Sequence, residues 1–409
     1  METQLARIAE RARENPKYKF MTLIHLINED TLSAAHNQMG ARKAPGVDGV
    51  TRKDYGENLE ENIKNLVSRM KKQAYKPQEV RRVRIPKPGT DKTRPLGIPA
   101  YEDKLVQAVA AQILNAIYEQ DFMGFSYGFR PKRSAHDALK HLNKLIEDHR
   151  VNYIVDADIK GFFDHVDHKW VMEFLKERIA DTNMLRLIYR FLRAGVIEAG
   201  VRYDTPEGTP QGGVISPILA NVYLHYVLDL WFQKVVRKHC RGSAHMVRYA
   251  DDFVCCFEFE EDARRFYVAL EKRLAKFNLE LAADKSQIIA FGKKAEAEAK
   301  ANGLPKPGTF DFLGFTHYCG KSRHGKFRVK RKTCRKKFKI SVAKAKEWIK
   351  SHRHIPVPDI MEVLKRKLQG YYQYYAVTDN SDALYRYKEQ IERLLFKWLN
   401  RRSQRKSFG

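Results

Sequence analysis

Cysteine is scarce in this sequence, with five residues in 409, and no two of them form a Cys-X-X-Cys pair. Zinc sites usually take closely spaced cysteine pairs, and an odd number leaves one cysteine over from any set of disulfides, so this pattern argues against a zinc site. Two of the five are adjacent in an apolar segment that favours a strand, where neighbouring side chains point to opposite faces. We interpret all five as reduced packing residues: Cys240, Cys255, Cys256, Cys319 and Cys334.

Long apolar runs are also missing. No segment approaches the ~18 consecutive apolar residues that a membrane-spanning helix needs. The first residues are polar and show no signal-peptide pattern, and no internal repeat is evident. We therefore expect no membrane insertion and a cytoplasmic location.

Acidic residues are outnumbered, with 49 Asp and Glu against 76 Lys and Arg, which gives a net charge of +27 and a pI near 9.7. Such an excess favours a polyanionic partner, with nucleic acid as the leading candidate and an anionic membrane surface as the competing one. A hydrophobic content of 43% fits a folded protein, and the length allows two or three domains with sizeable cores.

An aspartate pair separates two short apolar runs, residues 244–247 and 253–257. Strand formers on both sides predict a tight β-hairpin with Asp251 and Asp252 at its tip. Adjacent carboxylates repel each other, so the pair is costly unless a cation compensates it, and a hard divalent ion is the natural candidate. Aspartate is also common in solvated turns, and the pair alone leaves that alternative open.

A third carboxylate follows another strand-like run, residues 151–157. Asp158 and Asp251 meet if the two strands are neighbours in one sheet. Three acids at that place hold two Mg²⁺ roughly 4 Å apart, the spacing that stabilises both oxygens of an in-line phosphoryl displacement. The backbone carbonyl of Ile159 is a further oxygen ligand in this hypothesis.

Three ordered segments resemble the motifs of reverse transcriptases, and among these the bacterial group II intron-encoded reverse transcriptase/maturase family is most similar. The segments are residues 158–164, 209–217 and 249–252. The resemblance extends from about residue 20 to the end of the chain. It implies an α+β fold of the right-hand polymerase type, with fingers, a palm built on an antiparallel sheet, and a helical thumb. The expected divisions are an N-terminal extension with the start of the fingers (1–75), fingers (76–155), palm (156–320) and a basic thumb or maturase domain X (321–409).

The resemblance also implies roles for the acids. Asp158 and Asp251 bind the two Mg²⁺ directly, and Asp252 is a less direct partner. One ion lowers the pKa of the primer 3′-hydroxyl and the other steadies the pyrophosphate leaving group. Tyr249 and Ala250 belong to the same substrate-contacting turn. Asp156 and Asp164 fall outside the matched metal positions, and we expect them to be structural.

Further residues are expected to contact the incoming nucleotide. A basic hairpin over residues 80–99 suggests a triphosphate clamp, with a solvated sheet edge protected by charge as the alternative. The resemblance assigns phosphate contacts to Lys87 and Arg94, and Phe163 to a position under the sugar that excludes a 2′-hydroxyl. A core aromatic is the alternative for Phe163. The remaining expected contacts are Gln211 to the nucleotide, Gly212 beside the templating base and Lys285 as the acid that protonates pyrophosphate; an exposed strand lysine is the alternative there.

The C-terminal region is the most basic part of the chain. Residues 321–409 contain 26 Lys and Arg and 7 Asp and Glu, a net +19 of the total +27. Helices are predicted at about 335–351, 357–371 and 382–402. We expect a thumb that grips a template–primer duplex through phosphates, with a solvated basic surface as the alternative. Relatives continue beyond such a segment into a DNA-binding region, so a short or cut form without a nuclease is expected.

The sequence therefore predicts an RNA-directed DNA polymerase that extends a primer 3′-end with deoxynucleotides on an RNA template. A maturase role, binding intron RNA, is expected to accompany it. The alternatives are an RNA-binding splicing factor with secondary polymerase activity and a domesticated phage-defence or CRISPR-associated reverse transcriptase. The sequence does not fix the oligomeric state.

Overall fold

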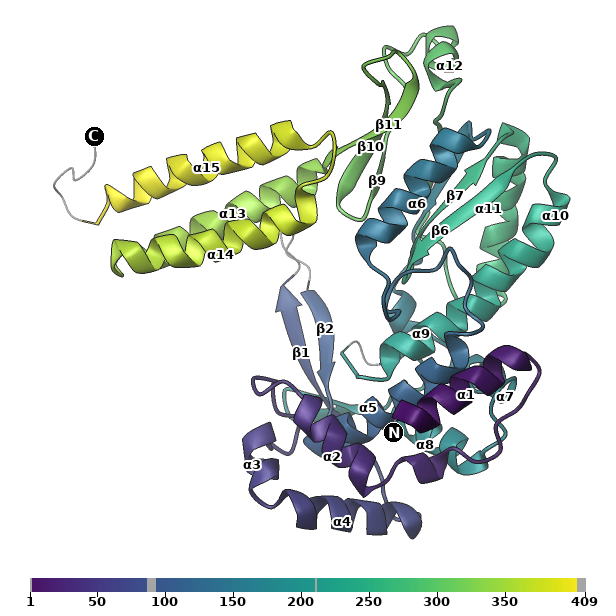
Figure 1. The fold of residues 1–409 in the computed structure, drawn as a ribbon, viewed down its shortest axis with the longest axis vertical. Coiled ribbons are helices and arrows are strands. Elements are labelled where there is room, and N and C mark those ends of the chain that lie inside the picture. Colours follow the sequence, from purple (N-terminus) through teal and green to yellow (C-terminus); the bar gives the residue numbers. More distant parts are fainter. Residues whose placement is uncertain (1, 87–92, 210–211, 403–409) are drawn as a thin grey trace.

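The computed structural model describes residues 2–86, 93–209 and 212–402. Lys87 and Gln211, both expected to contact the nucleotide, lie outside the described residues. The described chain combines many helices with three small sheets (Figure 1). This mixture confirms the predicted α+β class. None of the described helices is long and apolar enough to cross a membrane.

The N-terminal part is helical and packs against the long buried helix α5 (Tyr101–Tyr118). Two of its helices begin with capping boxes, in which Asn28 pairs with Thr31 and Thr51 with Asp54. Such boxes satisfy backbone N–H groups that a helix start leaves free. The elements are α1 (Glu2–Glu14), η1 (Ile24–Leu26), α2 (Glu29–Gln38), α3 (Arg52–Glu57) and α4 (Leu59–Lys71).

A basic hairpin follows, as predicted. Strands β1 (Val80–Pro86) and β2 (Thr93–Ile98) pair antiparallel, and Arg94 lies opposite Ile85. β1 also pairs in parallel with β4 (Val196–Glu198), which continues into β5 (Val201–Tyr203), so the sheet order is β2-β1-β4-β5. Glu198 forms ion pairs with Arg82 and Arg84 and thereby neutralises part of the cationic face.

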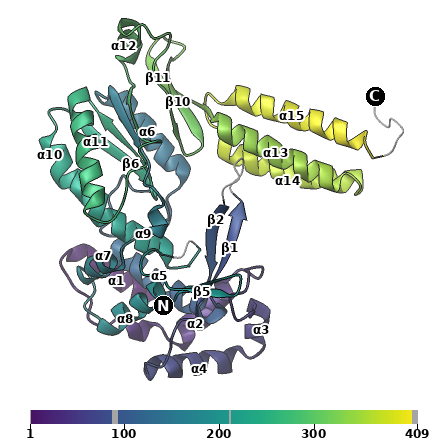
Figure 2. The same cartoon turned by 180° about the vertical axis from the view of Figure 1, so that it is seen from behind.

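The central sheet has the order β6-β7-β3-β8, and all neighbours are antiparallel. Helices α6 and α11 cover its opposite faces (Figure 2). Cys255 packs in the core cluster on the α11 side and Cys256 in the cluster on the α6 side, as the strand alternation predicts. The elements are β3 (Tyr153–Ala157), β6 (Ala244–Tyr249), β7 (Asp252–Phe257), β8 (Gln287–Ala290), α6 (Ala135–Asp148) and α11 (Glu260–Ala275).

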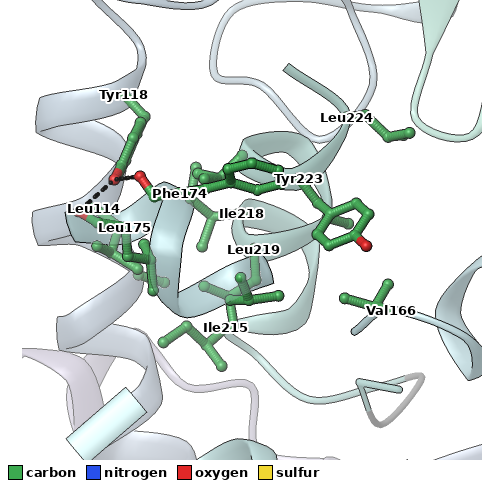
Figure 3. Close-up of a cluster of buried hydrophobic side chains, with 14 of the residues drawn as sticks. Leu114, Tyr118, Val166, Phe174, Leu175, Ile215, Ile218, Leu219, Tyr223 and Leu224 are labelled. Carbon is green, nitrogen blue, oxygen red and sulfur yellow. Dashed lines mark hydrogen bonds between the residues drawn. The ribbon is translucent and has the colours of Figure 1, made fainter. Parts of the chain in front are cut away.

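Helices α7 (His168–Lys176), α8 (Thr182–Leu192) and α9 (Ser216–Leu224) complete the main core with α5. Figure 3 shows the buried side chains where they meet, with the Tyr118 hydroxyl donating to the carbonyl of Leu175 at 3.2 Å. Each such large side chain contributes roughly 1.5–3 kcal/mol by leaving water. α9 is followed by two π-helical turns, η3 (His225–Asp229) and η4 (Phe232–Val236), and then by α10 (Arg237–His239).

The C-terminal part begins with a three-stranded sheet and ends in three helices that project away from the central sheet (Figures 1 and 2). Tyr371 stacks on Tyr387 with ring centres 3.8 Å apart, so tyrosines help to pack the bundle. The elements are α12 (Ala295–Ala301), β9 (Phe310–Phe312), β10 (Phe315–Lys321), β11 (Phe327–Thr333), α13 (Arg335–His352), α14 (Val357–Tyr375) and α15 (Ser381–Leu399). The three helices confirm those predicted in this region.

The bundle is connected to the rest of the protein at the β9–β10 turn. The Tyr374 hydroxyl donates to the carbonyl of Leu313 at 2.7 Å, and the Tyr375 hydroxyl lies close to Gly314. On the other side, His136 of α6 hydrogen bonds to the Tyr374 carbonyl at 2.8 Å. The turn, the bundle and α6 therefore meet at one helix end.

Candidate active site

The aspartate pair lies at a tight hairpin turn, as predicted. Tyr249 pairs with Asp252 at the ends of β6 and β7, which leaves Ala250 and Asp251 as the two loop residues. β3 runs antiparallel to β7 with Ala157 opposite Phe253, so the next residue, Asp158, comes level with Asp252. The structure thus brings the three predicted acids to the same end of two adjacent strands.

The carboxylates disturb one another. The pKa of Asp252 is raised to about 6, first by burial and then by repulsion from Asp251 and Asp158. Burial and the Asp158 charge likewise raise the pKa of Asp251. Asp156, expected to be structural, has its pKa raised to about 7, mainly by burial, with Asp252 among its charged neighbours. A cation nearby would therefore stabilise the ionised forms of these carboxylates at neutral pH.

One cation is supplied by the protein itself. The Lys285 ammonium lies 2.8 Å from Oδ2 of Asp158, and the side chain of Lys285 is 62% exposed. Nowhere in the described part of the chain do three His, Cys, Asp or Glu side chains already form a set that can hold a metal ion. The donor chemistry nevertheless fits Mg²⁺, which binds protein through one or two carboxylates and completes its shell with water and substrate phosphates.

The remaining predicted metal ligand, Ile159, has a buried side chain. The adjacent carbonyl, that of Asp158, accepts a hydrogen bond from the Ala282 N–H at 2.8 Å, and Ile159 forms an isolated antiparallel bridge with Leu281. The segment after β3 is thereby held against the segment that carries Lys285.

Phe163 lies in a short 3₁₀ helix, η2 (Phe162–Asp164), behind Gly161, whose φ is +54°. Phe162 is buried in the core, whereas Phe163 is only half-buried. The Phe163 carbonyl accepts a hydrogen bond from the Thr209 N–H at 2.8 Å. The glycine-rich segment therefore begins beside the backbone of the residue that is predicted to contact the sugar.

Gly212 connects this segment to the basic hairpin. Its φ is +109°, and a Cβ there would lie 2.6 Å from the Gly97 carbonyl oxygen of β2. Only glycine permits this approach. β2 also carries Arg94, whose charge acts to lower the pKa of Asp251. The glycine-rich segment, β2 and Arg94 thus lie together, and Arg94 is close enough to Asp251 for its charge to act on that carboxylate.

Two groups of supporting residues were missed in the sequence analysis. Gln107 of α5 accepts a hydrogen bond from the Val214 N–H at 2.9 Å and fixes the chain after the glycines; its sequence context gives no signal of this. Arg248 lies fully buried beneath the Ala250–Asp251 turn and pairs with Asp229. Its signal in the sequence is a charged residue inside an otherwise apolar strand, which the sequence analysis did not use.

Comparisons with known proteins agree with this geometry. Residues 85–317, more than half of the chain, match the family described as "Reverse transcriptase (RNA-dependent DNA polymerase)". Residues 335–409 match the "Group II intron, maturase-specific domain".

Three relatives illustrate the similarity. The group II intron-encoded protein LtrA of Lactococcus lactis subsp. cremoris is 40% identical over 244 residues, which cover 59% of this chain and 40% of that protein. Protein YkfC of Escherichia coli K12 is 33% identical over 280 residues, covering 61% of this chain and 73% of that protein. A putative COX1/OXI3 intron 1 protein of Saccharomyces cerevisiae is 30% identical over 217 residues, covering 53% and 26%. The match thus spans less than half of LtrA.

Proposed function

The chain belongs to the reverse transcriptase (RNA-dependent DNA polymerase) family, and from this premise we propose that it extends a primer 3′-end with deoxynucleotides on an RNA template. The observation that carries the proposal is the antiparallel pairing of β3 with β7, which puts Asp158 level with the Asp251–Asp252 turn. Two strands that are distant in the sequence thereby bring carboxylates close together, and nucleotidyl transfer with two metal ions requires carboxylates in such an arrangement.

In this proposal Asp158 and Asp251 hold two Mg²⁺, with Asp252 and the Ile159 carbonyl as supporting groups. When bound, the ions supply electrostatic stabilisation of the attacking and leaving oxygens. The protein's own residues orient the substrate. Arg94 binds the phosphates, where its planar guanidinium suits a two-point contact.

Two further side chains act on the nucleotide and the product. Phe163 packs beneath the sugar and excludes a 2′-hydroxyl, because the half-buried ring fills the space that this group requires. Lys285 donates a proton to a pyrophosphate oxygen as the phosphoryl bond breaks, a role that its raised pKa, caused mainly by the hydrogen bond to Asp158, keeps available at neutral pH.

The C-terminal helices extend the proposal to larger partners. Residues 335–409 match a maturase-specific domain, and residues 321–409 have a net charge of +19. We assign these helices to a thumb that binds the template–primer duplex and, in a maturase role, intron RNA. The earlier divisions into fingers (76–155) and palm (156–320) remain part of this proposal, and the cytoplasm is the compartment that its substrates imply.

The decisive experiment is primer extension by the purified chain on a defined RNA template with Mg²⁺ and deoxynucleotides. We expect full-length complementary DNA, and none when Asp158 is exchanged for Ala. A wild-type chain that binds the duplex but adds no nucleotide would favour the RNA-binding alternative. Retained RNA affinity in Asp158→Ala is the control that this variant is folded.

A further inference from the structure

A buried polar network lies directly beneath the turn that carries Asp251. The guanidinium of Arg248 forms a two-point ion pair with Asp229, with Nε 2.7 Å from Oδ1 and Nη2 2.5 Å from Oδ2. Both side chains are fully buried. The remaining nitrogen, Nη1, donates to Oδ1 of Asn221 at 3.1 Å and to the carbonyl of Ala250 at 2.9 Å. Arg248 thereby connects helix residues to the first residue of the loop.

The turn requires such support. Ala250 has φ +58°, whereas Asp251 has no positive φ. A positive φ at the first loop residue alone is the type II′ pattern, which strongly favours glycine there. A non-glycine residue in the left-handed region persists only where its surroundings fix it. Two contacts fix Ala250 in this structure. One is the hydrogen bond from Arg248 to its carbonyl, and the other is the close packing of Gly128 against its backbone nitrogen.

The side contact comes from the segment before α6. Gly128 lies so close to the turn that a Cβ there would be 2.2 Å from the Ala250 nitrogen. Asn221 fixes this segment, because its Nδ2 donates to the Gly128 carbonyl at 2.8 Å while its Oδ1 accepts from Arg248. One buried asparagine therefore couples the two supports of the turn.

The geometry of the ion pair explains why arginine is needed. The two-point contact with Asp229 fixes the plane of the guanidinium, and this plane aims Nη1 at the Ala250 carbonyl. A lysine ammonium can pair with Asp229 but has no second fixed donor. Buried ion pairs are often no more stabilising than apolar residues of the same volume, so stability alone does not account for this one. Asp229 also ends the π-helical turn η3, and such turns are frequent at functional sites.

We propose that Arg248 is a positioning residue of the polymerase reaction, which sets the place of the Asp251 carboxylate through the Ala250 carbonyl, with Asp229 and Asn221 as its partners. The inference rests on the proposed function. It predicts that the Asp251 turn loosens when the guanidinium is lost, even if the charge is kept.

The test compares Arg248→Lys with Arg178→Lys in the full chain. Arg178 is a matched control, because it is also buried (2% exposed), pairs with an aspartate (Asp121, 3.1 Å) and donates to backbone carbonyls, at Ala12 and Asn15. It does not contact the turn. Hydrogen exchange of the segment 245–253 is measured by mass spectrometry without metal or nucleic acid, together with Tm, duplex Kd and the single-turnover rate of nucleotide addition.

We expect Arg248→Lys to raise the exchange rate of the segment at least about tenfold and to lower the addition rate by at least about tenfold, since a displacement near 1 Å can cost about a hundredfold. Duplex Kd should change less than about twofold, because the network is buried away from the duplex surface. Arg178→Lys should lower Tm but leave both the exchange rate of segment 245–253 and the addition rate unchanged. Equal exchange and equal rates in the two variants would overturn the proposal.

The exchange measurement also separates this inference from the proposed function. If the wild-type chain adds no nucleotide, the polymerase proposal fails while the turn can still be tested.

If Arg248→Lys does not fold, Asn221→Ser replaces it, because this change keeps the ion pair and removes the coupling to Gly128. Faster exchange in 245–253 for Asn221→Ser supports the proposal, and wild-type exchange contradicts it.

Discussion

The ammonium nitrogen of Lys285 lies 2.8 Å from a carboxylate oxygen of Asp158, so the acid at the end of β3 has a counter-ion of its own. The hydrogen bond raises the pKa of Lys285. A divalent ion that binds Asp158 must share this carboxylate with the ammonium or displace it. Metal affinity and the position of Lys285 are therefore coupled.

Exchange of Lys285 for Met should separate two effects of this residue: its competition with Mg²⁺ for Asp158 and its proton donation to pyrophosphate. Loss of the competing ammonium should lower the half-saturating Mg²⁺ concentration, whereas loss of the general acid should slow addition by roughly a hundredfold or more. Single-turnover rates across a Mg²⁺ titration measure both. Lys160→Met is the control, because Lys160 is similarly exposed and pairs with Glu280. A Lys285 variant with unchanged rate would remove this residue from the mechanism.

Exchange of Asp251 for Ala should lower primer extension by at least about a thousandfold, because several kcal/mol of metal-based stabilisation depend on this ligand. Affinity for the RNA template should remain within about twofold, since the thumb supplies that binding. Extension and filter-binding assays test the two statements. Asp164→Ala, an exposed aspartate outside the cluster, should be active. Undiminished extension by the Asp251 variant would refute the site assignment.

Exchange of Phe163 for Val should admit ribonucleotides. The smaller side chain leaves room for a 2′-hydroxyl, and pocket discrimination of this size is typically worth about 10–200-fold. The ratio of kcat/KM for dCTP and CTP on the same primer measures the effect. The exposed Phe129 provides a control as Phe129→Val. Sugar discrimination that stays at the wild-type value would return Phe163 to a purely structural role.

Exchange of three exposed lysines near the start of the thumb for Gln should weaken duplex binding and flatten its salt dependence. The residues are Lys326, Lys336 and Lys339. Each lost phosphate contact lowers the slope of log K against log salt by about 0.9. The control carries the same loss of charge on the N-terminal part: Lys53, Lys71 and Lys72. An unaltered slope in the thumb variant would contradict the phosphate contacts.

Exchange of Asp252 for Asn should stabilise the metal-free protein near pH 7.5 but not near pH 4. The pKa of Asp252 is about 6 in the folded protein, above its ordinary 3.8. A raised folded pKa means that the proton binds more tightly in the folded state, so stability is fully present below pH ~4 and is lost as the pH rises through about 6. Neighbouring protein atoms desolvate the Asp252 carboxylate, but the residue still reaches solvent, so screening limits the effect to about 1 kcal/mol.

Thermal unfolding in EDTA between pH 4 and 8 measures this difference. Other buried carboxylates also have raised pKa values; burial raises that of Asp103 to about 7. They are present in both proteins, so their contributions to the pH dependence of stability cancel in the comparison. An Asn variant that is less stable by the same amount at every pH would show that charge repulsion at Asp252 is negligible.

Local patterns predicted much of the central sheet. Apolar runs on both sides of Asp251 and Asp252 indicated the β6–β7 hairpin, and the register of β3 against β7 places Asp158 beside it, as expected. Both follow from alternation and strand propensity over a few residues. The family resemblance, now supported by the match to residues 85–317, added the right-hand polymerase fold that such patterns alone do not define.

Features that depend on distant partners were not predicted. β4 is only three residues long and pairs with β1 across more than a hundred residues of chain, so no local pattern indicates it. The same holds for the contact of Lys285 with Asp158 and for the pairing of Arg248 with Asp229. The π-helical turns after α9 replace ordinary helical turns, and their apolar periodicity resembles that of a regular helix.

The contact of Tyr374 with Leu313 and His136 has a consequence for the cycle of synthesis. After each addition the duplex must advance by one base pair while the thumb keeps its grip. Any rotation of the bundle must either break the Tyr374–Leu313 hydrogen bond or carry the β9–β10 turn with it, and α6 follows through His136. In the proposed polymerase reaction, a bundle rotation that keeps both hydrogen bonds therefore moves the β9–β10 turn and α6 together with the helices that we assign to the duplex.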